Sequence, residues 1–330
     1  MRGSIFLKTC LNNNQGKGRL QKIAQVIGNV LVVVSIIFIV RIIIKLGISQ
    51  EILQTIIEHW PVLLFAVLLW VAYVYISAFG WNRILAFLEG KDIPYSEICN
   101  IYVKSNIGKY VPGNVMHLVG RNILGARYNI SQSNMAISTV LEIGLSVLSA
   151  IFYAVLFARN NLWVILEHFN ARILAVAVPI LVVLGIISVY VLRKKLLEIV
   201  QNIILPFTLK KFWNALVILQ IFLLNYLLMG SIFFLTARYV CGFGDSIPMM
   251  SIIGIFLLSW LAGYITPGAS GGLGVREIIL LTLLSPFYSR ESIVTVIVIH
   301  RIVTTMGDIA AYLFILLIGR MGKIKEETGD

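Results

Sequence analysis

The chain has little charge. Charged residues make up 13% of its 330 residues, whereas about 25% is usual in soluble globular domains. Hydrophobic residues reach 59%, and the mean hydropathy is +0.92. A composition this apolar excludes a soluble globular domain and predicts a polytopic, all-α membrane protein.

Cysteine and histidine are also scarce, with three and four residues. Cys10, Cys99 and Cys241 have neither the number nor the spacing of a disulfide framework or a zinc site. No second histidine lies at a metal-binding distance along the chain from His117. The glycine-rich stretch near residue 270 is not followed by the Gly-Lys-Ser/Thr of a nucleotide loop. We therefore expect no metal, no cofactor and no nucleotide site.

The charge that is present is mostly positive, with a formal net charge of +12. The lysines and arginines lie in short runs beside the apolar segments, which is the placement of topology signals and also suits anionic lipid headgroups. We therefore expect no nucleic-acid partner. The expected partner is a membrane phospholipid or a lipid-linked substrate, and the oligomeric state is left open.

Apolar windows long enough to cross a bilayer, which takes roughly 20 helical residues, occur six times. We predict full spans at residues 23–46, 61–87, 134–158, 172–192, 212–239 and 292–319. Two further segments, 98–125 and 249–287, each contain one Pro-Gly break. The flanks of each break are too short or too polar for an independent span.

Basic residues concentrate in both tails and in the connections at 83–127 and 193–211. The positive-inside rule assigns these parts to the cytoplasm. Basic and non-basic connections then alternate correctly between the two sides of the membrane if both Pro-Gly segments are re-entrant hairpins. The first hairpin enters from the cytoplasm and the second from outside. Six spans plus two hairpins then place both termini on the cytoplasmic side of the plasma membrane. Eight spans are the alternative, and the charge bias does not decide between them.

The two Pro-Gly segments repeat one pattern. A proline, a glycine one residue on and an arginine nine residues on occur as Pro112, Gly113 and Arg121 and again as Pro267, Gly268 and Arg276. We predict two repeats of inverted topology, with the Pro-Gly pairs as hinges. The expected organisation is a cytoplasmic tail (1–20), a first repeat (21–158), an external linker (159–171), a second repeat (172–319) and a cytoplasmic tail (320–330).

The repeated arginines are the first candidates for binding residues. A guanidinium stays charged and binds phosphate through paired hydrogen bonds, which suits a phospholipid or polyprenyl-phosphate headgroup. Lys109 lies close to Arg121 in the sequence and is a further candidate. The alternative is that Arg121 and Arg276 lie at the membrane interface, extend toward water and only set the topology.

Four glycines occur in the eight residues from 267 to 274. Their amide groups can approach an anion closely, and a helix beginning near Val275 directs its N-terminal dipole at the same place. The candidate binding positions are Ser270, Gly271 and Gly272. The alternative is that the glycines serve close helix packing.

Three charged residues lie inside the predicted spans, namely Glu142, Arg301 and Asp308. Placing one of them at mid-bilayer costs at least about 2.5 kcal/mol, so we expect them to face inward. Glu142 and Arg301 lie 30 and 34 residues after their prolines, at similar depths, and we predict an ion pair between them across the two repeats. This pair either joins the repeats or lets Glu142 exchange a proton during transport.

Glu277 follows Arg276 directly, and a carboxylate there could bind an amine-bearing headgroup. Adjacent helical residues point in different directions, so the two need not pair with each other. His117 is interpreted as a polar loop residue. Interface or packing positions are expected for the aromatic residues Trp81, Tyr110, Trp260 and Tyr264, and the alternative is that they line a cavity.

Together these residues resemble the flippase-like integral membrane family typified by the transmembrane domain of lysylphosphatidylglycerol synthases. The resemblance covers residues 20–320 and is carried by 108–113 with Arg121, by Glu142, by 267–277 and by Arg301. It implies a lipid-handling bundle, whose best understood form moves an aminoacylated phospholipid between leaflets. Members commonly have Glu-Arg where this chain has Glu142-Ile143.

We therefore expect a lipid translocase that moves a polar or aminoacylated phospholipid or a lipid-linked headgroup. The aminoacyl-transferase domain of the full synthases is not expected in this chain, so a separate lipid-modifying enzyme is an expected partner. One alternative is a membrane-embedded glycosyltransferase or another transferase that uses a polyprenyl-linked substrate. Another is a non-catalytic scaffold for the synthesis of envelope lipid or polysaccharide.

Overall fold

The computed structural model describes residues 49–111, 116–125, 130–158, 208–266, 272 and 274–328. Regular structure in this part of the chain is entirely helical. The helices are α2 (Gln50–Glu58), α3 (Trp60–Glu89), α4 (Tyr95–Asn106), the 3-10 helix η1 (Ile107–Tyr110), α5 (Met116–Gly125), α6 (Gln132–Ala158), α9 (Leu209–Tyr239), α10 (Met249–Ile265), α11 (Val275–Leu284) and α12 (Arg290–Thr328).

Some of the predicted features lie outside the described residues. These are the spans at 23–46 and 172–192 and the tips of both Pro-Gly segments, which hold Pro112, Gly113, Pro267, Gly268, Ser270 and Gly271.

Four of the described helices are long and apolar enough to cross a membrane, namely α3, α6, α9 and α12 over residues 290–318. This confirms the spans predicted at 61–87, 134–158, 212–239 and 292–319. Their outer faces carry exposed large apolar side chains, such as Leu68 on α3 and Leu148 on α6. Helices that are apolar all round suit a lipid environment, so the chain is a multi-pass membrane protein.

Local signals set the ends of these helices. Pro61 occupies the first turn of α3, where its missing N–H leaves no bond unmade, and Gly90 ends the helix in the left-handed conformation with φ 68°. At α9 the side chain of Thr208 accepts a hydrogen bond from the backbone N–H of Lys211, which is a common N-terminal cap.

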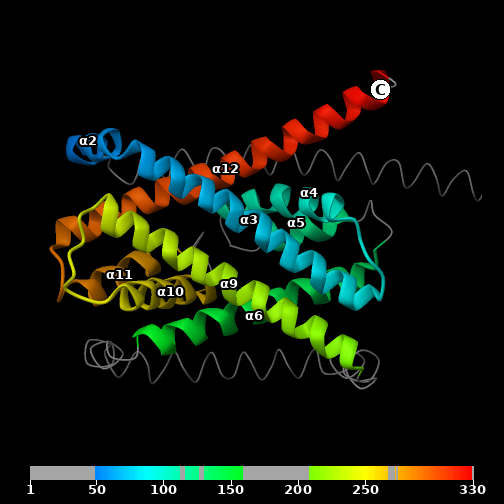
Figure 1. The fold of residues 1–330 in the computed structure, drawn as a ribbon, viewed down its shortest axis with the longest axis horizontal. Helices are drawn as coiled ribbons and strands as arrows, with labels where there is room; N and C mark the ends of the chain where they lie inside the picture. Colours follow the sequence, from blue (N-terminus) through cyan, green and yellow to red (C-terminus); the bar gives the residue numbers. More distant parts are fainter. Residues whose placement is uncertain are drawn as a thin grey trace, which may run out of the picture.

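The two Pro-Gly segments form pairs of short helices, α4 with α5 and α10 with α11. The first pair lies toward one end of the long helices, and the second pair lies toward the opposite end (Figure 1). At the first end, Glu89 accepts hydrogen bonds of 3.0 Å from Ser131 and Asn134, joining α3 to α6. At the other end, the hydroxyl of Tyr288 donates to the carbonyl of Gly244 at 3.0 Å.

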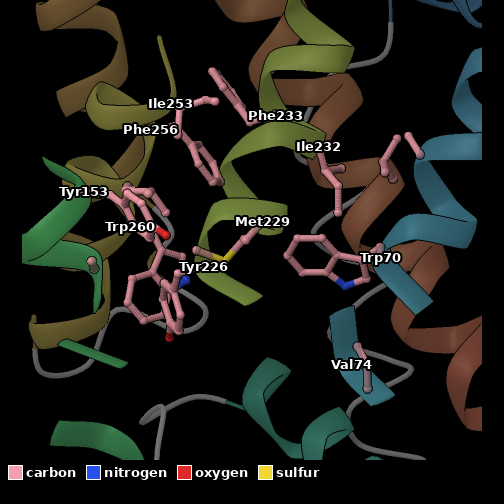
Figure 2. Packing of buried hydrophobic residues seen from close by; sticks show 14 of the residues in the cluster. Trp70, Val74, Tyr153, Tyr226, Met229, Ile232, Phe233, Ile253, Phe256 and Trp260 are labelled. Atoms are coloured by element: carbon pink, nitrogen blue, oxygen red, sulfur yellow. The ribbon is translucent and has the colours of Figure 1, made fainter. Parts of the chain in front are cut away.

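Aromatic packing joins α9 to α10. Phe233 and Phe256 stack with ring centroids 4.4 Å apart, and Tyr226 meets the edge of Trp260 at 5.0 Å (Figure 2). On the α3 side, Gly307 of α12 gives space to the indole of Trp70, because a Cβ at residue 307 would lie 2.7 Å from the Trp70 Cβ. These contacts make a closely packed frame around a central polar region.

Candidate functional site

A cavity of about 130 Å³ lies between the short helices and the long spans. All the described helices except α2 contribute to its wall. Its charged lining residues are Lys109, Arg121, Glu142, Arg276 and Arg301, and Gly272 also lines it. The cavity therefore collects charged residues that the sequence places almost 200 positions apart.

Arg121 of α5 and Glu142 of α6 form a buried ion pair, with 2% and 7% of their surfaces exposed. The guanidinium donates to both carboxylate oxygens, at 3.3 Å for the Nη2–Oε1 bond. The Tyr102 hydroxyl donates to Glu142 Oε1 at 2.8 Å, and the guanidinium carbon lies 4.2 Å from the centre of the Tyr102 ring. The interpretation of Arg121 as an interface residue is therefore wrong.

Glu277 of α11 and Arg301 of α12 form the second pair. Arg301 donates from Nε at 2.9 Å and from Nη2 at 2.6 Å, both to Glu277 Oε1. The other carboxylate oxygen accepts the backbone N–H of Gly274 at 2.6 Å and so caps the start of α11. This start at Val275 agrees with the sequence prediction.

The ion pair predicted between Glu142 and Arg301 is wrong. Each of these residues lies on a long span and binds an opposite charge from the short helix pair of its own half, Arg121 in one case and Glu277 in the other. The signs are exchanged between the halves, because the short helix supplies the arginine in the first half and the carboxylate in the second.

Asp308 is the third carboxylate near the cavity, and only 1% of its surface is exposed. Its Oδ2 lies 2.7 Å from Lys109 Nζ and accepts the Tyr110 hydroxyl at 2.5 Å. Its Oδ1 accepts Asn106 Nδ2 at 3.0 Å and Trp70 Nε1 at 3.1 Å. Asp308 therefore ties the first short helix pair and α3 to α12.

Arg276 differs from the other three cations that line the cavity. No carboxylate among the described residues lies within 4.0 Å of its guanidinium, and its Nε is buried without a hydrogen-bond partner there. Gly272 makes room for this side chain, because a Cβ at Gly272 would lie 3.3 Å from Arg276 Nη2 and 3.2 Å from the Cα of Gly263. With φ 74°, Gly272 also adopts a conformation that favours glycine.

Tyr110, Trp260 and Tyr264 were interpreted as interface or packing groups; they pack in the bundle and also line the cavity. The rings of Trp260 and Tyr264 stack at 4.6 Å. His117 is not a loop residue, since it lies on α5, is 8% exposed and faces the cavity. Proximity to the Pro-Gly breaks is the signal that could have identified all four.

The sequence analysis missed a group of hydroxyl-bearing residues on the long spans, Tyr73, Ser77, Ser146 and Tyr226. Tyr73 and Ser77 are four residues apart on α3 and so share one helix face. Polar positions at this spacing within an apolar span are the signal that could have found them. Among the residues that the structure describes, no group of three or more potential ligands could hold a metal.

A polar cavity inside an apolar bundle defines the class: a multi-pass membrane protein with an internal polar cavity. A family profile described as the lysylphosphatidylglycerol synthase TM region matches residues 26–311, so the chain belongs to this family. The resemblance drawn from the sequence is confirmed, and the membership indicates a membrane protein involved in lipid handling. A comparison with curated proteins finds no match.

Proposed function

We propose that the protein is a lipid translocase that moves a polar phospholipid or a lipid-linked headgroup between leaflets. The observation that carries the proposal is the internal cavity with four cationic side chains, Lys109, Arg121, Arg276 and Arg301. A guanidinium binds a phosphate diester through paired hydrogen bonds. A headgroup that crosses the bilayer needs such a polar site, while its acyl chains stay in the lipid.

The arrangement of the short helices supports transport by alternating access. The α4–α5 and α10–α11 pairs lie toward opposite ends of the bundle (Figure 1), as expected for re-entrant hairpins of an inverted repeat. On this proposal the halves rock about hinges at Pro112, Gly113, Pro267 and Gly268. The cavity then opens to one leaflet at a time.

In the proposed translocase, Arg276 binds the headgroup, and Ser270, Gly271 and Gly272 supply backbone donors beside it. Arg121 and Arg301 hold the cavity wall through Glu142 and Glu277, and Lys109 does so through Asp308. The protein is proposed to act in the plasma membrane with both termini in the cytoplasm. A separate lipid-modifying enzyme is the proposed source of any modified substrate.

Reconstitution in liposomes tests this function. In liposomes that contain the parent protein, a fluorescently labelled phospholipid should cross from the inner to the outer leaflet. The crossing is measured as the loss of fluorescence when a membrane-impermeant quencher is added. Arg276→Ala should slow this crossing by about tenfold or more, because the variant lacks a charged hydrogen-bonding contact to the phosphate. Arg238→Ala is the matched control, since Arg238 lies in the last turn of α9, pairs with the exposed Asp245 and does not line the cavity.

A parent protein that moves no lipid, or an Arg276→Ala variant that moves it as fast as the parent, would overturn the proposal. Turnover of a polyprenyl-linked sugar donor by the pure protein would replace it with a transferase. Stable co-purification with an envelope-synthesis enzyme, without lipid movement, would replace it with a scaffold.

A further inference from the structure

The charges around the cavity do not balance. Four cations line it: Lys109, Arg121, Arg276 and Arg301. Three buried or half-buried carboxylates, Glu142, Glu277 and Asp308, each bind one of these cations. In the described part of the chain, the cavity therefore has one cation in excess.

Each of the three carboxylates already has its partners. Glu142 accepts from Arg121 and Tyr102, and Glu277 accepts from Arg301 and the Gly274 amide. Asp308 has four donors, two on each oxygen. None of them is left to receive an ammonium group from a ligand.

The cation in excess is Arg276. The undescribed tips of the two short helix pairs, 112–115 and 267–271, contain no Asp or Glu and so supply no carboxylate to it. Its buried Nε without a partner requires an acceptor, because an unpaired polar group in a low-dielectric site is unfavourable. The N-terminal end of α11, where Arg276 lies, also favours a negative charge.

The cavity is also lined by hydroxyl-bearing side chains from the long helices, those of Tyr73, Ser77, Ser146 and Tyr226. Hydroxyl groups both donate and accept hydrogen bonds, so they match hydroxyl groups of a ligand.

We infer that the cavity selects a headgroup with a single net negative charge, a phosphodiester whose substituent carries hydroxyl groups rather than an amine. The inference rests on the proposed function and specifies its substrate class. It departs from the aminoacylated lipid expected from the sequence, because the amine of such a lipid would meet no available carboxylate. One anion neutralises Arg276, whereas a zwitterionic or cationic headgroup leaves an uncompensated charge in the cavity.

The test compares three lipids with the same labelled acyl chain in one liposome system. Phosphatidylglycerol is singly anionic, phosphatidylethanolamine is zwitterionic, and lysylphosphatidylglycerol is cationic. The parent protein should move phosphatidylglycerol about tenfold faster than either of the others. Arg276→Gln makes the cavity neutral and should abolish this preference, whereas Arg276→Lys should keep its direction.

Variants that make the cavity more positive give a second test of the charge selection. Glu142→Gln and Glu277→Gln each add one cation in excess, and both should slow lysylphosphatidylglycerol further relative to phosphatidylglycerol. A loss of packing alone would not move the preference in opposite directions for arginine and glutamate variants. The inference fails if the parent moves lysylphosphatidylglycerol as fast as phosphatidylglycerol, or if Arg276→Gln retains the parent's preference.

Binding in detergent separates a lipid site from a site for a free anion. Phosphatidylglycerol should raise the thermal unfolding temperature of the parent more than of Arg276→Gln, and inorganic phosphate should not reproduce the difference. Equal stabilisation by inorganic phosphate would overturn the assignment to a lipid. If phosphatidylglycerol binds selectively but no lipid moves, the translocase proposal fails and the charge selection stands. If all three lipids move equally fast, the charge selection fails and the translocase proposal stands.

Discussion

Burial determines what each charged residue in this protein can do. Arg121 and Asp308 expose 2% and 1% of their surfaces and lie within hydrogen-bonded networks. A buried ion pair adds little net stability compared with apolar residues, but loss of one member is costly because the other charge stays buried. The pairs therefore fix the position of charges rather than strengthen the fold.

The Arg121–Glu142 pair gives a stability prediction. Glu142→Gln should lower the free energy of unfolding by about 3–5 kcal/mol, because Arg121 would remain as an uncompensated buried cation. Unfolding of the purified protein in detergent measures this loss. The double variant Arg121→Gln with Glu142→Gln should recover most of it, since no charge is then left unpaired.

The control for this experiment is a pair at the surface. Asp92 lies 3.8 Å from Arg83, and its side chain is 98% exposed, so Asp92→Asn should change stability by about 1 kcal/mol or less. A double variant no more stable than Glu142→Gln alone would contradict the explanation by charge pairing.

The sequence predicted which charges gather at the site better than it predicted their partners. The pattern shared by Arg121 and Arg276, and the cost of charge inside a span, selected residues that line the cavity. The partner of Glu142 was missed because an offset along the chain gives depth in the membrane but not the direction of a side chain around its helix axis. Short helices that bring opposite charges nearer cannot be seen in such offsets.

At the scale of the elements, hydropathy predicted the four long helices that the structure describes, but it did not predict where each of them ends. A window of about 20 apolar residues is a strong signal, so α3, α6 and α9 begin and end within a few residues of their predicted bounds. α12 continues to Thr328, nine residues past the predicted end, because Lys325, Glu326 and Glu327 favour helix although they end the apolar window. The turn of 3-10 helix at η1 was not predicted.

A glycine allows α3 and α12 to pack closely at one point of their contact. Gly307→Ala should lower the free energy of unfolding by about 1–3 kcal/mol, because the new methyl group would lie 2.7 Å from Trp70 Cβ and 2.5 Å from its Cδ1. Unfolding in detergent is again the measurement.

Gly144→Ala on α6 is the matched control for that substitution. A Cβ at Gly144 meets no atom within 4 Å, so the change should be neutral or stabilise the helix by up to about 1 kcal/mol. If the two alanine variants were equally stable, close packing at Gly307 would not be the reason for the glycine.

At the scale of the whole molecule, the described part of the chain contains two sets of four helices with the same order of long and short elements. α3, α4, α5 and α6 form one set, and α9, α10, α11 and α12 form the other. Their short pairs lie toward opposite ends of the bundle (Figure 1). The proposed opposite orientation of the two sets in the membrane would account for both the positive charge in alternate connections and this placement.

Labelling from the two sides of the membrane tests the orientation. In a background without Cys10, Cys99 and Cys241, Lys91→Cys should react with an impermeant thiol reagent only from the cytoplasmic side, because it lies in the connection before α4. Asp245→Cys, in the connection before α10, should react only from outside. Reaction of both from one side would exclude the inverted repeat.

The exchange of signs between the two buried ion pairs has a consequence for the history of this chain. Residues 121 and 142, and residues 277 and 301, keep each pair neutral while its charges occupy opposite helices. A change at one position alone leaves the charge of its partner without a counter-charge inside the bundle. We therefore expect substitutions at these positions to occur in pairs among related chains, so that residues 121 and 142 covary and residues 277 and 301 covary.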